Sequence, residues 1–200
     1  MSTAAPGPGP QPARRVLIVH GYDSHPDAHW FRWLRTSLGE VGVASAAVRL
    51  PSPHAPVADE WCAAISAALG SPDTGTWVVA HSLGCISTVR ALAALAEPWE
   101  LGGLVLVAGF TGRLAALPEL DGYLADDVDT STVRARTRSR VVLRSDGDPY
   151  VPAASTDALA DRLGAELHVV PGAGHFMAED GVTTLDLVRD VVLRGTAARR

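Results

Sequence analysis

The architecture of this chain follows from one short segment, Val78-Val79-Ala80-His81-Ser82-Leu83-Gly84. Its β-branched apolar residues end abruptly in small residues around one serine, and an alanine-rich amphipathic segment follows at once. The pattern predicts a nucleophile elbow, a sharp strand-to-helix turn of the form G-x-S-x-G in which Ala80 takes the first glycine position. The backbone of such a serine is strained, at a cost of roughly 1–3 kcal/mol, and crowding requires small residues two positions to either side.

Apolar runs of strand length recur on both sides of this turn. The first, residues 15–20, is continuous, which is typical of a strand buried on both faces of a parallel sheet. We predict strands at residues 15–20, 43–50, 76–80, 101–107, 140–145 and 166–170. Amphipathic segments predict helices from a cap at Asp27 to about residue 38, across 61–69, from Ser82 to about 96, and at 153–163 and 183–193. This alternation favours an α/β fold, in which ligands bind beyond the carboxyl ends of the strands.

Residues 108–138 interrupt the alternation, because they run much longer than the usual connection of about 4–6 residues. They combine scattered apolar residues with an acidic patch at 126–129 and arginines at 134, 136 and 138. We interpret the segment as a small cap over the site. A solvated helix face explains the arginines better than a phosphate clamp does.

Length and composition limit the class of protein. The 200 residues fit one domain, which we expect to span 14–195 between a disordered leader (1–13) and a flexible tail (196–200). A net charge of −5 provides no electrostatic footprint for nucleic acid or an anionic membrane, and no apolar run approaches a membrane span. Cys62 and Cys85 are too few for a disulfide framework and lack metal-ligand spacing. We therefore expect a soluble, cytoplasmic protein that needs no cofactor or metal; its oligomeric state stays open.

Ser82 needs a base to become a nucleophile, and His175 is the best-placed histidine. It lies in a glycine-rich loop directly after the last predicted strand, which can bend the imidazole back over the elbow. The other histidines have positions that a structural role explains, at the end of a strand, in a loop or in packing. They are at positions 20, 25, 29, 54, 81 and 168.

A carboxylate should hold the imidazole of His175, and Asp148 is the best candidate. It stands just after the fifth predicted strand, in a turn that Pro149 restricts; Asp146 is the local alternative. The order Ser82, Asp148, His175 is the Ser…Asp…His order of α/β-hydrolases.

The remaining site residues follow from the loops beside the elbow. Backbone N–H groups of Leu83 and Tyr22 are predicted to form an oxyanion hole, and Gly21 allows a close backbone approach. His20, Gly21 and Phe110 are further predicted to contact substrate. Cys85 is interpreted as a small packed thiol rather than a second nucleophile, and the helical spacing of the tryptophans at 30, 33 and 61 favours core positions over a substrate pocket.

The chain resembles the small α/β-hydrolases of the family of YdeN-like and retinoblastoma-binding-protein-nine-like serine hydrolases. The similarity covers nearly all of residues 14–193, and its closest correspondences are His20-Gly21-Tyr22, His29-Trp30-Phe31 with Trp33-Leu34, Glu60-Trp61, residues 79–85, residues 148–152 and Gly174-His175-Phe176. It implies the triad of Ser82, Asp148 and His175 and leaves the substrate open. The expected fold is a single α/β-hydrolase domain with a minimal cap and a mainly parallel six-stranded sheet in the order 2-1-3-4-5-6.

These observations predict a metal-free serine hydrolase that cleaves small carboxylic esters through an acyl-serine intermediate. Small esters are favoured because little cap exists to shape a large, selective pocket, while thioesters and activated amides stay open. Two alternatives remain. The same triad can serve an acyltransferase, or the fold can serve a binding protein with little catalytic activity.

Overall fold

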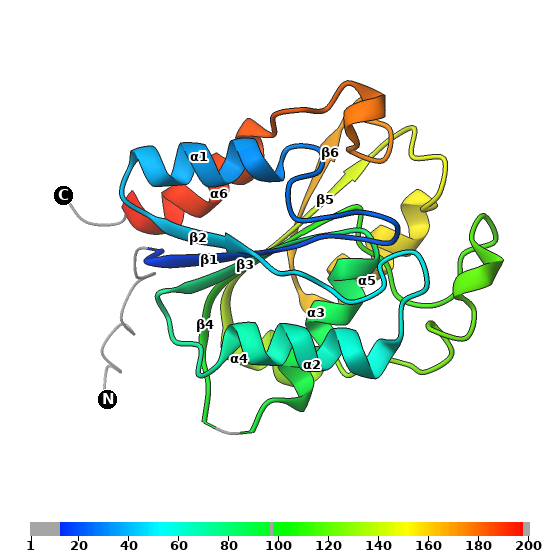
Figure 1. The fold of residues 1–200 in the computed structure, drawn as a ribbon, viewed down its shortest axis with the longest axis horizontal. Coiled ribbons are helices and arrows are strands. Elements are labelled where there is room, and N and C mark those ends of the chain that lie inside the picture. The colour runs from blue at the N-terminus through cyan, green and yellow to red at the C-terminus, as the bar shows by residue number, and fades with distance from the viewer. Residues whose placement is uncertain (1–12, 97, 198–200) are drawn as a thin grey trace, which may run out of the picture.

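A computed structural model describes residues 13–96 and 98–197, which form one six-stranded parallel sheet flanked by helices (Figure 1). The remaining residues of the predicted leader and tail, 1–12 and 198–200, lie outside the described part. The strands are β1 (Arg15–Val19), β2 (Ala44–Ala47), β3 (Thr76–His81), β4 (Leu101–Val107), β5 (Thr137–Ser145) and β6 (Glu166–Val170). The helices are α1 (Phe31–Glu40), α2 (Ala58–Leu69), α3 (Leu83–Ala94), α4 (Ser131–Arg136), α5 (Ala153–Leu163) and α6 (Asp186–Ala197), with short 3-10 helices η1 (Pro118–Leu120) and η2 (Ala178–Asp180).

The sheet order is β2-β1-β3-β4-β5-β6, as predicted. All neighbouring strands are parallel, and the central register pairs Ile18 with Val79, Val79 with Val105 and Val105 with Val141. The direction of winding reverses beside β1 and β3. Because parallel strands end at one edge of the sheet, the loops after β1, β3, β5 and β6 meet there.

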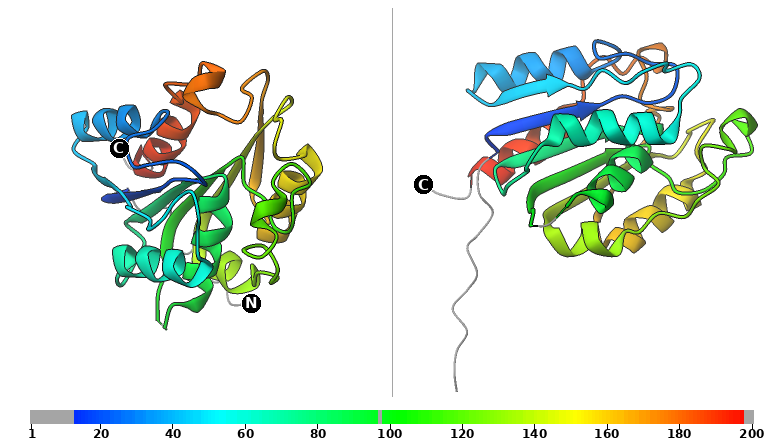
Figure 2. Two further views of the ribbon diagram at one scale, coloured as in Figure 1. Left: turned by 45° about the vertical axis from the view of Figure 1, so that its right-hand side comes forward. Right: turned by 60° about the horizontal axis from the view of Figure 1, so that its bottom comes forward.

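Strands β1, β3 and β4 are buried on both faces, which explains their continuous apolar runs, whereas the edge strands β2 and β6 are partly exposed. Val16 and Ile18 point into one core cluster with residues of α1 and α6, while Leu17 and Val19 point into the other with residues of α2, α3 and α5. Figure 1 shows α1 and α6 together on one side of the sheet, and the two turned views of Figure 2 keep α2 and α3 on the other.

Several predicted boundaries are wrong. The second strand ends at Ala47 rather than at 50, and the last helix begins at Asp186 rather than at 183. The first helix begins at Phe31 rather than near Asp27, whose exposed carboxylate pairs with Arg35 instead of capping. β5 begins at Thr137 rather than at 140, because it pairs with β4 from Leu101 onward. α6 extends to Ala197, so 196–197 are helical rather than part of a flexible tail.

The inserted segment between β4 and α4 packs against α3 and α5. Leu120, Tyr123 and Val128 are buried in the same core cluster as the central strands. Arg90 of α3 donates to the carbonyls of Tyr123 (2.8 Å) and Asp126 (2.9 Å). The segment is therefore a small, anchored cover. No helix in the described residues combines the length and hydrophobicity that a membrane span requires.

Candidate active site

Ser82 sits at a sharp turn between β3 and α3, with a φ of 53° and a ψ of −126°. Its N–H donates to the Val107 carbonyl of the neighbouring strand (2.9 Å). A Cβ added at Gly84 would lie 2.4 Å from the His20 carbonyl oxygen, so the position tolerates only glycine while the loop after β1 keeps its place. Ala80 is completely buried. The small residues flanking the serine thus have a steric cause, and the strained turn presents the hydroxyl beyond the edge of the sheet.

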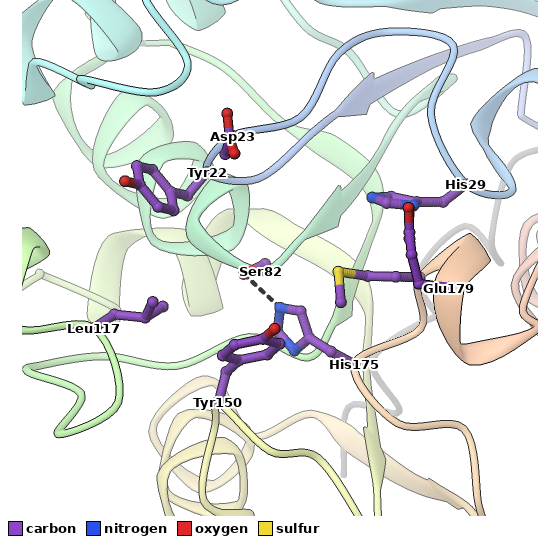
Figure 3. Close-up of a pocket in the computed structure, with 9 residues that line it drawn as sticks. Tyr22, Asp23, His29, Ser82, Leu117, Tyr150, His175 and Glu179 are labelled. Atoms are coloured by element: carbon purple, nitrogen blue, oxygen red, sulfur yellow. Dashed lines mark hydrogen bonds and ion pairs between the residues drawn. The ribbon is translucent and has the colours of Figure 1, made fainter.

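A continuous chain of hydrogen bonds joins Ser82, His175 and Asp148 (Figure 3 shows its first link). His175 Nε2 lies 2.9 Å from Ser82 Oγ, and His175 Nδ1 lies 2.7 Å from Asp148 Oδ2. Because a carboxylate only accepts, the ring proton belongs on Nδ1, and Nε2 is free to accept from the serine hydroxyl. The arrangement can therefore remove the hydroxyl proton.

The carboxylate of Asp148 is held by its own turn. Its other oxygen accepts hydrogen bonds from the N–H groups of Tyr150 (2.9 Å) and Val151 (3.0 Å). The side chains of His175 and Asp148 are only 6% and 5% exposed, so little water competes for their bond. Asp146, the alternative that the sequence left open, instead accepts from the Gly172 N–H (2.7 Å) at the base of the histidine loop.

The loop that carries His175 is fixed from several elements. Asp180 accepts from the backbone N–H groups of His175 (2.8 Å) and Met177 (3.0 Å). On the opposite side, His81 Nε2 donates to the His175 carbonyl (2.8 Å), and Trp30 Nε1 donates to the Phe176 carbonyl (3.1 Å). Burial, and then the neighbouring His175, hold the pKa of His81 well below its usual value. His81 is thus a neutral donor that fixes the backbone of His175.

The loop after β1 runs directly against Ser82. A Cβ added at Gly21 would lie 2.8 Å from Ser82 Cβ and 3.4 Å from Ser82 Oγ. In the described residues, the N–H groups of Tyr22 and Leu83 donate to no carbonyl or side chain. Backbone N–H groups without an acceptor are the kind of donor that a developing oxyanion requires.

A cavity of about 290 Å³ opens at Ser82. Its walls are Tyr22, Asp23, His29, Ser82, Leu117, Tyr150, His175, Met177 and Glu179. Figure 3 shows Leu117 and Tyr22 on one side of the serine, and His29 with Glu179 on the other. His29, Met177 and Glu179 were not predicted. These three residues form a wall where two loops distant in the sequence meet, and the Ala178 N–H donates to His29 Nδ1 (3.1 Å) across the junction. Burial lowers the pKa of His29.

Three residues predicted to contact substrate do not line this cavity. Phe110 is completely buried and packs in the core cluster that contains Leu106 and Leu159. His20 is 2% exposed and lines a different cavity, and Gly21 backs onto Ser82.

The other sequence interpretations concern thiols and tryptophans. Cys85 is completely buried, with its Sγ 3.5 Å from the Val107 carbonyl, and burial raises the pKa of its thiol. Trp30 and Trp61 are core residues, as predicted, whereas Trp33 is half-buried beneath the guanidinium of Arg189.

Comparison with known proteins agrees with this geometry. A family model described as serine hydrolase matches residues 16–194. The chain belongs to the serine hydrolase family. It is 34% identical to YdeN of Bacillus subtilis over 179 residues, covering 90% of this chain and 94% of YdeN. It is also 28% identical to the serine hydrolase RBBP9 of Rattus norvegicus, covering 82% of this chain and 88% of RBBP9.

Solved structures agree on the fold of this serine hydrolase. The crystal structure of the YdeN gene product superposes with a TM-score of 0.88 at 33% identity, covering 92% of this chain and 98% of that one. Est1E from Butyrivibrio proteoclasticus, at 18% identity, has a TM-score of 0.68 and covers 92% of this chain and 90% of that one. The structures thus share one α/β-hydrolase framework.

Proposed function

We propose that this serine hydrolase is a carboxylesterase that cleaves small esters through an acyl-serine intermediate. The observation that carries the proposal is the unbroken chain from Ser82 Oγ through His175 to Asp148, with distances of 2.9 and 2.7 Å. Each of the three side chains stands after a different strand, on a local structure that fixes it.

In the first half-reaction, Ser82 Oγ attacks the ester carbonyl carbon while His175 Nε2 takes the hydroxyl proton. The carbonyl oxygen becomes an oxyanion, which accepts hydrogen bonds from the N–H groups of Leu83 and Tyr22. Collapse of the tetrahedral intermediate breaks the bond to the alcohol, which leaves with the proton from His175. Asp148 stays ionised throughout and stabilises the imidazolium.

In the second half-reaction, water replaces the alcohol. His175 removes one proton from the water, the hydroxide adds to the acyl carbon, and Ser82 departs with the proton that His175 returns. The products are a carboxylic acid and the regenerated serine. The chemistry that this geometry supports requires no further group.

The size of the site favours a small substrate. The cavity of about 290 Å³ lies at the low end of the usual range for ligand sites, roughly 300–1,000 Å³. Leu117, Tyr22 and Tyr150 supply apolar and aromatic walls for an acyl or alcohol group. A crystal structure of the fold relative Est1E is described as holding ferulic acid, which is a carboxylic acid.

Our first prediction tests the nucleophile. Wild-type protein should react with a fluorophosphonate and hydrolyse p-nitrophenyl acetate and butyrate. In Ser82→Ala, labelling should vanish and turnover should fall by up to a factor on the order of 10⁶, because the variant lacks the hydroxyl that forms the acyl intermediate. Labelling is read by intact-mass spectrometry, and turnover by release of p-nitrophenolate.

The matched control is Ser71→Ala, an exposed serine in the α2–β3 connection, at the opposite end of the sheet. It should label and turn over like wild type. Wild-type protein that neither labels nor turns over ester would overturn the proposal and favour a binding role. An added alcohol or amine that captures most of the acyl group would instead favour an acyltransferase.

A further inference from the structure

His20 is a buried polar residue that the mechanism above does not use. Its side chain is 2% exposed, and its ring stacks edge-on against Trp61 at a centroid distance of 5.9 Å. It does not reach the cavity at Ser82. It lines a separate cavity of about 330 Å³, together with residues such as Arg49 and Leu50. Buried polar side chains normally have a hydrogen-bond partner, so a partner for the His20 ring is expected.

The partner of the His20 ring is the backbone carbonyl of the next residue, Gly21. His20 Nδ1 lies 2.9 Å from the Gly21 carbonyl oxygen. Because a carbonyl can only accept, Nδ1 carries the proton and donates it. Burial lowers the pKa of His20, which keeps the ring neutral with this single proton in place.

The Gly21 carbonyl belongs to the same peptide unit as the Tyr22 N–H. In a planar trans peptide, the C=O and N–H bonds point in opposite directions. A donor that holds the carbonyl on the His20 side therefore directs the N–H the other way. Tyr22 lines the cavity at Ser82, and its N–H has no acceptor in the described part of the chain.

We propose that His20 is a positioning residue that orients and polarises the Gly21–Tyr22 peptide for oxyanion binding. This inference rests on the proposed function, because the oxyanion forms only if Ser82 attacks a carbonyl. The bond from His20 fixes the peptide plane, and donation to a carbonyl makes the N–H of the same amide a stronger donor. A Cβ at Gly21 would lie 2.8 Å from Ser82 Cβ, so the peptide that His20 holds runs directly beside the nucleophile.

The test compares two substitutions at one position. His20→Leu removes the donor, whereas His20→Asn places an amide N–H near the position of Nδ1. For p-nitrophenyl butyrate, we expect His20→Leu to lower kcat about 10- to 100-fold with little change in KM, since loss of one complete donor costs about 10²–10³. His20→Asn should recover most of the loss. His54→Leu, at an exposed loop position, should match wild type.

Two further measurements distinguish a positioning role of His20 from a general perturbation of the folded structure. An alkylboronic acid, which forms a tetrahedral adduct with a serine, should lose affinity in His20→Leu by the same factor as kcat/KM, because both report the oxyanion state. The ¹⁵N resonance of Tyr22 should shift in His20→Leu and stay close to its wild-type position in His20→Asn.

Equal losses in His20→Leu and His20→Asn, or a rise in KM alone, would overturn the role of His20. Inactive wild-type protein would overturn the proposed function instead, and the Tyr22 resonance would still decide whether His20 holds the peptide. An unchanged Tyr22 resonance in His20→Leu would mean that His20 does not hold the Gly21–Tyr22 peptide.

Discussion

Asp146 and Asp148 are separated by one glycine, yet they hold different parts of the site. Asp148 accepts the Nδ1 proton of His175 and two backbone N–H groups of its own turn. Asp146 accepts from the Gly172 N–H, at the start of the loop that carries the histidine. The first acts on the imidazole itself, and the second acts on the backbone that leads to it.

The second prediction follows from this difference. In Asp148→Asn, the amide can donate to Nδ1 and stabilise the wrong tautomer, so kcat should fall by a factor of about 10⁴. In Asp146→Asn, the remaining carbonyl oxygen still accepts from Gly172, and we expect a loss below about 10-fold. Both values come from steady-state hydrolysis of p-nitrophenyl butyrate. A larger loss in Asp146→Asn than in Asp148→Asn would reverse the assignment.

At the scale of elements, the inserted segment is attached to the helices at its two sides. Besides the bonds from Arg90 of α3, Arg162 of α5 donates to the Asp127 carboxylate (2.8 Å) and to the Val128 carbonyl (2.6 Å). The segment contributes Leu117 to the wall of the cavity. Its anchors therefore set how firmly one wall of the site is held.

The third prediction concerns these anchors. Arg162→Gln removes the ion pair and weakens the bond to the carbonyl, so amides in residues 111–128 should exchange with deuterium several-fold faster. Amides of β4 and β5 should be unaffected, because global stability depends on the core. Hydrogen exchange read by mass spectrometry gives both. Arg14→Gln, which breaks an exposed pair with Asp73 near the start of β1, is the matched control. Faster exchange throughout the sheet would contradict a local anchor.

The elements that were predicted correctly are those whose local pattern agrees with their packing. β4, α5 and β6 have the predicted bounds of 101–107, 153–163 and 166–170. The start of α1 was misplaced because Asp27 is a good capping residue by type but takes a different partner, Arg35. Which partner a side chain takes depends on the groups near it in the folded structure, and the hydrophobic periodicity of the sequence does not reveal them.

The site shows the same division. The proximity of Ser82, Asp148 and His175 could be predicted, because each follows a strand and has distinctive neighbours. The wall formed by His29, Met177 and Glu179 could not, because it exists only where the loops after β1 and β6 meet. Phe110 has the residue type and position of a substrate contact but is buried, which depends on how the inserted segment folds. Contacts between loops were therefore the missing information.

At the scale of the whole molecule, folding places several histidines together at the edge of the sheet that carries the site. The ring centroids of His81 and His175 are 5.0 Å apart, and those of His81 and His29 are 5.6 Å apart. Burial lowers the pKa of His20, His29 and His81, most strongly for His81. The native state therefore holds these rings neutral under conditions in which the unfolded chain protonates them.

This difference makes stability depend on pH. A histidine in the unfolded chain binds a proton below its ordinary pKa of about 6.5, while buried His81 stays neutral to a much lower pH. Below about pH 6.5 the unfolded state binds more protons, so the free energy of unfolding rises with pH in this window and falls on acidification. For one histidine the slope reaches at most about 1.4 kcal/mol per pH unit.

The last prediction isolates His81 from the other two rings. His81→Gln keeps a side-chain N–H that can donate to the His175 carbonyl but removes the titrating group. Between pH 7.5 and 5.5, the free energy of unfolding of wild-type protein should therefore fall by about 1 kcal/mol more than that of the variant. His20 and His29 are present in both proteins, so their contributions cancel in this comparison.

Urea denaturation at the two pH values supplies the four free energies that this comparison needs. His54→Gln should follow wild type, because that side chain is exposed in both states. An equal fall in wild type and His81→Gln would mean that His81 takes up its proton without opening the structure, contrary to its complete burial. A smaller fall in the variant ties the acid sensitivity of the fold to the ring that fixes the backbone of His175.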